Sequence, residues 1–215
     1  MQNYPVNESD NRNNDTRTFT PVLTYALTII NVIVFFIEII AGGSEDTETL
    51  LRLGAAYTPY IIEKHEWYRL ILPIFMHFGI EHIASNSLAL LAMGQYVEAY
   101  YGRVRYIIIY MISGIAGNLL SVAIELFTGS YAVSAGASGA ICGLLGSMII
   151  FAIDPKTRKS FPISRIIISL ALVLLPGFTD ASVNAAAHLG GVIAGFLTGL
   201  IMYGIKILRK DYNLV

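Results

Sequence analysis

Runs of roughly 20 apolar residues recur along this chain and constrain its fold more than any other feature. At a rise of 1.5 Å per residue, a helix of about 20 residues crosses the roughly 30 Å hydrocarbon core of a bilayer. Of the 215 residues, 55% are hydrophobic and 13% are charged, and this charged fraction is about half the usual one for a soluble domain. The pattern predicts an all-α, polytopic membrane protein.

Six apolar runs are candidate transmembrane helices, at residues 22–41, 80–97, 104–127, 134–153, 163–178 and 183–207. The polar composition of residues 1–20 predicts a disordered tail, so the membrane domain should cover residues 21–208, with a second tail at 209–215. No cleavage-site pattern of small residues precedes the first run, which favours a retained helix over a signal peptide. The fifth run is short and ends near Pro176, so a tilted or re-entrant segment is the alternative there.

The basic residues of the short loops predict the orientation of these spans. With the amino terminus inside, the cytoplasmic side holds eleven of them: Arg12, Arg17, Arg103, Arg105, Lys156, Arg158, Lys159, Arg165, Lys206, Arg209 and Lys210. The opposite side holds three, Arg52, Lys64 and Arg69. Both termini should therefore be cytoplasmic. The long first loop, 42–79, should lie in the outer interface, where its only tryptophan, Trp67, would settle.

Charge and cysteine content exclude two classes of protein. A net charge of -1 provides no polycationic surface, so we expect no nucleic-acid partner. A single cysteine, Cys142, rules out an internal disulfide framework. The partners that remain are the lipid bilayer and other membrane proteins.

Polar side chains inside the spans are costly, which makes each one a functional candidate. They are Asn31, Glu38, His82, Asn86, Asn118, Glu125, Ser138, Asn184 and His188. Glu38 and Glu125 lie near the outer ends of their spans, where they could simply reach headgroups. We expect His65 and His77 to be interfacial.

Four of these residues should share one level. The second, fourth and sixth spans all run inward, which brings His82, Asn86, Ser138 and His188 beneath the outer surface. Glycines at 191, 195 and 199 form one face of the sixth span, and glycines at 136, 139, 143 and 146 lie along the fourth. Because small residues let transmembrane helices approach closely, Ser138 and His188 should come within hydrogen-bonding reach.

A serine hydroxyl beside an imidazole is the minimum for nucleophilic catalysis. Asn86, His82 and the backbone N–H of Ser138 could stabilise the resulting oxyanion. The spans carry no acidic residue at that depth to orient His188, so packing or Asn184 would have to hold its ring. This chemistry uses no cofactor and no metal.

Other interpretations of the same residues remain open. Serine in a glycine-rich span commonly stabilises helix packing or hydrogen-bonds to carbonyls of its own helix, and His82 with Asn86 could form only interhelical hydrogen bonds. His82, His188 and Cys142 could be metal ligands, although without a fixed short spacing. The chain could also be a transporter with a histidine proton relay, or a module that binds transmembrane helices without cutting them.

Several segments resemble the rhomboid family of intramembrane serine proteases. The Gly136-Ala137-Ser138-Gly139 segment resembles the family's Gly-x-Ser-Gly motif, and Ala187-His188-Leu189-Gly190-Gly191 resembles its catalytic histidine segment. The segment from His82 to Asn86 matches His-x-x-x-Asn. Trp67-Tyr68-Arg69 resembles the Trp-Arg motif of the first loop, and Gly94, Glu98 and Gly102 resemble the signature that ends the second helix.

The resemblance implies a six-helix rhomboid-like bundle and a serine endopeptidase with a Ser-His dyad. Ser138 would be the nucleophile, His188 the general base and then acid, and His82 and Asn86 the oxyanion donors. Substrates would be single-span membrane proteins, cut near the outer edge of a membrane that we expect to be the bacterial plasma membrane. The position of Cys142 departs from the pattern, because many relatives carry there an aromatic residue that packs on the catalytic imidazole.

Overall fold

The fold is seen in a computed structural model that describes residues 19–175 and 183–212. Within those ranges the chain is helical and forms no strand, apart from an isolated antiparallel bridge between Ala56 and Ser134. The all-α expectation is therefore confirmed. The elements are α1 (Val22–Ala41), α2 (Thr47–Leu53), α3 (Thr58–Glu63), η1 (Trp67–Leu70), η2 (Leu72–Phe75), α4 (Gly79–Tyr101), α5 (Arg103–Thr128), α6 (Ser138–Ser147), α7 (Ile149–Ile153), α8 (Ile163–Leu174) and α10 (Ala185–Tyr212).

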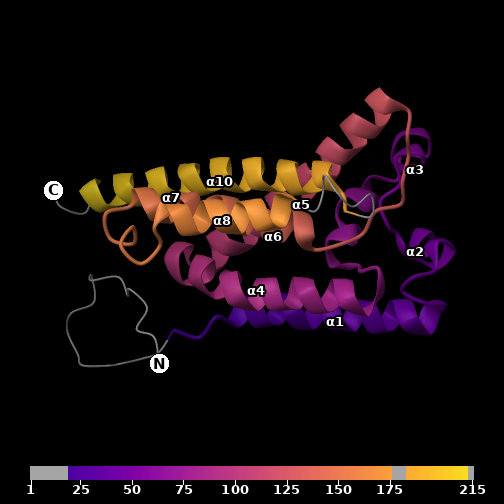
Figure 1. Ribbon diagram of the computed structural model, residues 1–215, viewed down its shortest axis with the longest axis horizontal. Coiled ribbons are helices and arrows are strands. Elements are labelled where there is room, and N and C mark those ends of the chain that lie inside the picture. The colour runs from indigo at the N-terminus through magenta and orange to yellow at the C-terminus, as the bar shows by residue number, and fades with distance from the viewer. Residues whose placement is uncertain (1–18, 176–182, 213–215) are drawn as a thin grey trace.

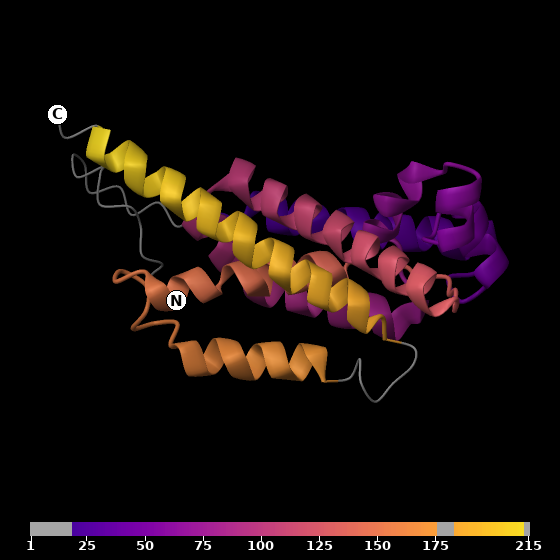
Figure 2. The same ribbon diagram turned by 90° about the horizontal axis from the view of Figure 1, so that it is seen from above.

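The long helices form an elongated bundle (Figure 1). Helix α10 packs against both α5 and α6, and α1 packs along α4. The short helices α2 and α3 lie at one end of the bundle, while α1 begins and α10 ends toward the other end. Helix α8 runs along an outer edge (Figure 2).

Exposed apolar side chains indicate whether the outer faces of the bundle contact water or lipid. Large residues lie on its outer faces, including Ile40 of α1, 85% exposed, and Phe127 of α5, 92% exposed. By length and composition, α1, α5 and the 185–205 part of α10 are suited to crossing a membrane, whereas the apolar stretches 138–153 and 163–174 are shorter. Helix α4 is long enough but more polar. A surface this apolar fits lipid better than water.

The helix boundaries differ from the expected spans in several places. Helix α6 begins at Ser138 rather than at Ser134, because residues before it bond outward: Ser134 exchanges two backbone hydrogen bonds with Ala56, and the Gly136 N–H donates to the Pro73 carbonyl. The fourth run is divided into α6 and α7 at Met148. Helix α8 ends at Leu174, and the expected end at 178 lies outside the described residues. Helix α10 continues to Tyr212, into the expected tail; residues 1–18 and 213–215 of the two tails also lie outside the described residues.

A buried carboxylate joins the beginning of α1 to the end of α4. Glu98 is fully buried and accepts hydrogen bonds from the backbone N–H groups of Leu23 (3.0 Å) and Thr24 (2.8 Å), and from the Thr24 hydroxyl (2.9 Å). These N–H groups lie in the first turn of α1, where a helix has no internal acceptors. Glu98 therefore caps α1 from a position about 75 residues away in the chain.

Two further ionic residues fix the first loop: Arg69 joins segments within the loop, and Glu125 joins the loop to α5. Arg69 is buried, donates through Nη1 to the carbonyl oxygens of Leu51 (2.8 Å) and Ala55 (2.9 Å), and pairs with Glu66. Glu125 of α5 accepts a 2.6 Å hydrogen bond from the Thr58 hydroxyl of α3, which ties this carboxylate to the first loop. These bonds fix the loop end of the bundle, where α4, α6 and α10 begin.

Candidate catalytic site

Three of the expected site residues lie at the beginnings of three helices. Ser138 is the first residue of α6, His82 the fourth of α4 and His188 the fourth of α10. We expected Ser138 to lie a few residues inside its helix. Its actual position leaves its backbone N–H without an acceptor inside α6, at the positive end of the helix dipole.

Gly136 brings the His82 ring and the Ser138 hydroxyl to the same place. Its φ of +154° is one that residues with side chains rarely adopt. A Cβ there would lie 2.8 Å from Cε1 and 3.0 Å from Nε2 of His82, and 3.5 Å from Oγ of Ser138. Glycine is therefore required for both the backbone turn and the space. The structure thus brings together two residues that are 56 positions apart.

Close packing of α6 on α10 places His188 beside this position. A Cβ on Gly139 would lie 3.3 Å from the Ala187 carbonyl oxygen, and one on Gly191 would overlap the Gly139 carbonyl. Ser138 and His188 each adjoin one member of this Gly139–Ala187 contact along the chain. The expected use of the glycine faces is confirmed: a Cβ on Gly195 would likewise overlap the Gly143 backbone.

The His188 side chain is 8% exposed and lies beside the Val173 backbone of α8. It is also close enough to His82 for their charges to interact. Within the described residues its Nδ1 atom has no hydrogen-bond partner. No hydrogen bond between a carboxylate and this ring occurs among the described residues, and the Val173 backbone is its contact with α8.

Asn86 lies one turn after His82 on α4 and is 6% exposed. Within the described residues its Nδ2 amide has no hydrogen-bond partner. A buried donor without an acceptor is costly, and such groups in native structures often serve function. The Asn86 amide is available for an acceptor that arrives from outside the protein.

Asn184 has a different role from the one we considered for it. Its Oδ1 accepts from the Ala187 N–H (2.9 Å), and its Nδ2 donates to Ser121 Oγ (2.8 Å) and Ser134 Oγ (3.0 Å). It does not hold the His188 ring by a hydrogen bond; instead it caps the beginning of α10. Asn184 also ties that beginning to α5 and to the segment before Ser138.

His77 and Glu38 are the residues that sequence reasoning placed wrongly. We expected His77 at the interface and Glu38 at the headgroups, yet both are fully buried. The Glu38 carboxylate accepts from the His77 N–H (3.2 Å to Oε1), and the His77 ring meets the His82 ring edge to face, with 5.3 Å between centroids. Burial, together with the neighbouring His82, lowers the pKa of His77 to about 3, so this imidazole is neutral. His77 lies five residues before His82 in the chain, and this short separation was the sequence signal that the two rings could meet.

Cys142 is 1% exposed inside α6. Among the described residues, no group of three or more His, Cys, Asp or Glu side chains is arranged to hold a metal ion. The structure thus brings the His82 ring to the Ser138 hydroxyl and to the His77 ring, and Asn86 follows one turn after His82 on α4.

Comparison with known proteins places this arrangement in a family. Residues 64–205 match the family model for the rhomboid domain, and this match contains Ser138, His188, His82 and Asn86. Rhomboid protease GluP of Bacillus subtilis (strain 168) is 39% identical over 177 residues, which are 82% of this chain and 34% of GluP. RHOMBOID-like protein 1 of Arabidopsis thaliana is 38% identical over 168 residues, 77% of this chain and 41% of that protein.

A shorter relative is matched over most of its length. The putative rhomboid protease YdcA of Bacillus subtilis (strain 168) is 33% identical over 185 residues, 84% of this chain and 88% of YdcA. The chain thus spans only about a third to two fifths of GluP and RHOMBOID-like protein 1, but nearly all of YdcA.

Proposed function

This chain belongs to the rhomboid family and is an integral membrane protein, and from that premise we propose that it is an intramembrane serine endopeptidase. Its catalytic residues are Ser138 as nucleophile and His188 as general base and acid. His82 and Asn86 stabilise the oxyanion. The observation that carries the proposal is the meeting of Ser138 Oγ and the His82 ring at Gly136. The next residue after Ser138, Gly139, packs on Ala187, which directly precedes His188.

The first half of the reaction forms an acyl-enzyme. His188 takes the proton of the Ser138 hydroxyl as Oγ attacks the scissile carbonyl carbon. The carbonyl oxygen becomes an oxyanion, which accepts hydrogen bonds from the Asn86 amide, the His82 imidazole and the Ser138 N–H. The C–N bond then breaks, and His188 returns its proton to the leaving amine.

The second half repeats these roles with water. His188 takes a proton from water as the water oxygen attacks the ester carbonyl of acylated Ser138. The same donors bind the second oxyanion, and Ser138 leaves with the proton that His188 returns. The buried, unpartnered Asn86 amide supports this assignment, because a donor held ready costs no reorganisation when the charge develops.

The substrates we propose are single-span membrane proteins, cut near the outer edge of the bilayer after a small residue. A helical peptide bond is shielded by its own hydrogen bonds, so segments weakened by glycine or proline should enter the site more readily. The site fits that depth, since it lies in the first turns of α4, α6 and α10, near the first loop. The membrane we propose is a bacterial plasma membrane, with both termini cytoplasmic.

The test is cleavage of a tagged single-span substrate in liposomes, with the product mass determined. Purified wild type should cleave it, and Ser138→Ala should lower turnover by about a thousandfold or more. Ser130→Ala, at an exposed serine outside the site, is the matched control and should retain wild-type turnover. A serine-reactive phosphonate should label the wild type at Ser138 only.

Three results would contradict the proposal. Equal cleavage by wild type and Ser138→Ala would indicate another nucleophile. Substrate binding without cleavage or phosphonate labelling would indicate a helix-binding protein. Ion flux that depends on His82 and His188 but not on Ser138 would indicate a transporter.

A further inference from the structure

The turn between α7 and α8 has a defined conformation. Asp154, 5% exposed, accepts the Lys156 N–H through Oδ1 (2.9 Å) and the Tyr100 hydroxyl through Oδ2 (2.6 Å). Its backbone carbonyl accepts the N–H groups of Thr157 and Arg158, each at 3.0 Å. The turn is thus folded around one buried carboxylate and anchored to α4 through Tyr100.

This turn displays three cations that have no partner among the residues the structure describes. The side chains of Lys156, Arg158 and Lys159 are exposed, and within the described part of the chain none of them has a hydrogen-bond or ion-pair partner. The first-loop cations differ, because Arg69 binds two carbonyls and Glu66, and Lys64 lies 3.4 Å over the Tyr60 ring. Three free cations within four residues leave a concentrated positive charge.

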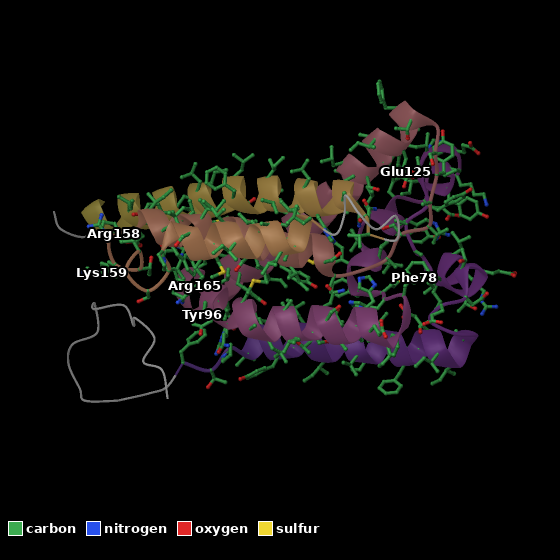
Figure 3. All side chains as sticks on the ribbon, in the orientation of Figure 1. Phe78, Tyr96, Glu125, Arg158, Lys159 and Arg165 are labelled. Carbon is green, nitrogen blue, oxygen red and sulfur yellow. The ribbon has the colours of Figure 1, made fainter. Side chains whose placement is uncertain are left out.

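Apolar and aromatic side chains lie directly beside the turn. The Phe161 ring packs on the rings of Tyr96 and Phe151, with 5.2 Å between centroids in each pair. Ile153 and Ile163, at the ends of α7 and α8, are about half exposed. The cations therefore lie where hydrocarbon gives way to headgroups, and Figure 3 shows Arg158, Lys159 and Tyr96 at the same end of the bundle.

We propose that the Lys156–Lys159 turn is a binding site for the phosphate group of an anionic phospholipid in the inner leaflet. The leaflet assignment rests on the topology proposed above. Arg158 can offer a bidentate fork to a phosphate, and the two lysines add point charges beside it. A phospholipid suits this place better than free phosphate, because its acyl chains can cover Ile153, Ile163 and the Phe161 ring.

The bound lipid would also hold α8 in place. Helix α8 follows the turn directly, buries only Ile166 completely, and passes beside His188 at Val173. A helix with so few buried contacts depends on its ends for its position. A phospholipid at the turn would fix the first end of this helix.

The expected strength follows from the number of cations. Each Lys or Arg near an anionic membrane surface contributes about fivefold to affinity, so three together contribute at most about a hundredfold. Because these charges are exposed, the affinity should fall as salt rises.

The test is native mass spectrometry of the purified full chain in detergent micelles titrated with phosphatidylglycerol or phosphatidylcholine. The wild type should retain one phosphatidylglycerol at concentrations where phosphatidylcholine is lost. Arg158→Gln should raise the dissociation constant about fivefold, and the Lys156→Gln/Arg158→Gln/Lys159→Gln variant about a hundredfold. Arg103→Gln is the matched control, since Arg103 is also exposed on the proposed inner side but lies 3.9 Å from Glu98; it should change the constant less than twofold.

Several outcomes would overturn the site. Equal effects of Arg103→Gln and Arg158→Gln would indicate a diffuse field over the whole inner surface. An unchanged constant in the triple variant would exclude the turn. Displacement of the lipid by millimolar inorganic phosphate would mean that the turn takes free phosphate instead. The measurement needs neither cleavage nor a defined orientation, so its failure is distinguishable from failure of the protease proposal.

Discussion

The closest contact between α6 and α10 should control the geometry of the proposed dyad, and Gly195→Ala tests it. A Cβ at this position would lie 1.9 Å from the Gly143 carbonyl oxygen, whereas ordinary van der Waals contact begins at 3.4 Å. The Cβ is fixed to one helix backbone and the carbonyl oxygen belongs to the other, so neither can rotate away. The two helices must therefore separate by about 1.5 Å, and overpacking of this kind costs about 1–3 kcal/mol or more.

That separation should act on the chemistry, because Gly195 lies two helical turns after His188 on the same face of α10. A misplacement of about 1 Å in a catalytic group can lower turnover about a hundredfold. We therefore expect Gly195→Ala to lose about a hundredfold in turnover of the single-span substrate. Phosphonate labelling of Ser138 should slow as well, since it depends on the same hydroxyl and imidazole.

The matched control lies nine residues further along the same helix. A Cβ on Gly204 would have no atom of the described residues within 4 Å, so Gly204→Ala should keep wild-type turnover and gain up to about 1 kcal/mol from helix propensity. In detergent, the thermal unfolding midpoint should fall in Gly195→Ala and rise in Gly204→Ala, relative to wild type. Wild-type turnover together with a wild-type midpoint in Gly195→Ala would refute the close approach of α6 and α10.

Three further predictions follow from individual contacts. Asn86→Ala should lower kcat by about a hundredfold to a thousandfold with little change in KM, because the Asn86 amide acts on the oxyanion and not on the bound substrate; a rise in KM alone in steady-state kinetics would argue for a binding role. Asn184→Ala removes the α10 cap and should lower the free energy of unfolding by about 1 kcal/mol. The loss should be larger if the hydroxyl groups of Ser121 and Ser134 stay unpaired, and chemical denaturation in mixed micelles measures it. The Arg69 guanidinium holds the pKa of Glu66 below its usual range. This pair should therefore stabilise the first loop fully above the unfolded pKa of about 4.5, and the stabilisation should be lost as pH falls through the lower folded pKa. The thermal midpoint should fall more steeply from pH 6 to pH 3 in wild type than in Glu66→Gln, and parallel curves would contradict the pairing.

The proposed mechanism depends more on backbone packing than on side-chain partners. Gly136, Gly139 and Gly191 let three helix beginnings meet without intervening side chains. Asn184 and Glu98 then hold helix ends that have no internal hydrogen-bond acceptors. In the described residues no carboxylate is hydrogen-bonded to the His188 ring of the proposed dyad, so small changes in helix spacing should alter catalysis more than changes in local charge.

Periodicity and spacing along the chain were enough to predict the helical class, the six runs and the shared level of Ser138, His82 and His188. These properties depend on helical rise and on the cost of polar groups in lipid, and both act within one helix at a time. The glycine faces were predictable for the same reason, since residues three and four apart share one face of a helix.

Only the tertiary structure decided how the polar residues find partners. The expectations for Glu38 and His77 failed, because both side chains are buried by contacts that form only when the chain packs. The Glu38 carboxylate accepts the backbone N–H of His77, and the His77 ring packs on the His82 ring. The position of Ser138 as the first residue of α6 likewise follows from the bridge between Ala56 and Ser134 and from the Gly136 bond to Pro73. Hydrogen bonds between segments tens of residues apart leave no periodic signal in a sequence. They arise when the chain packs, and here they determine where the proposed nucleophile lies.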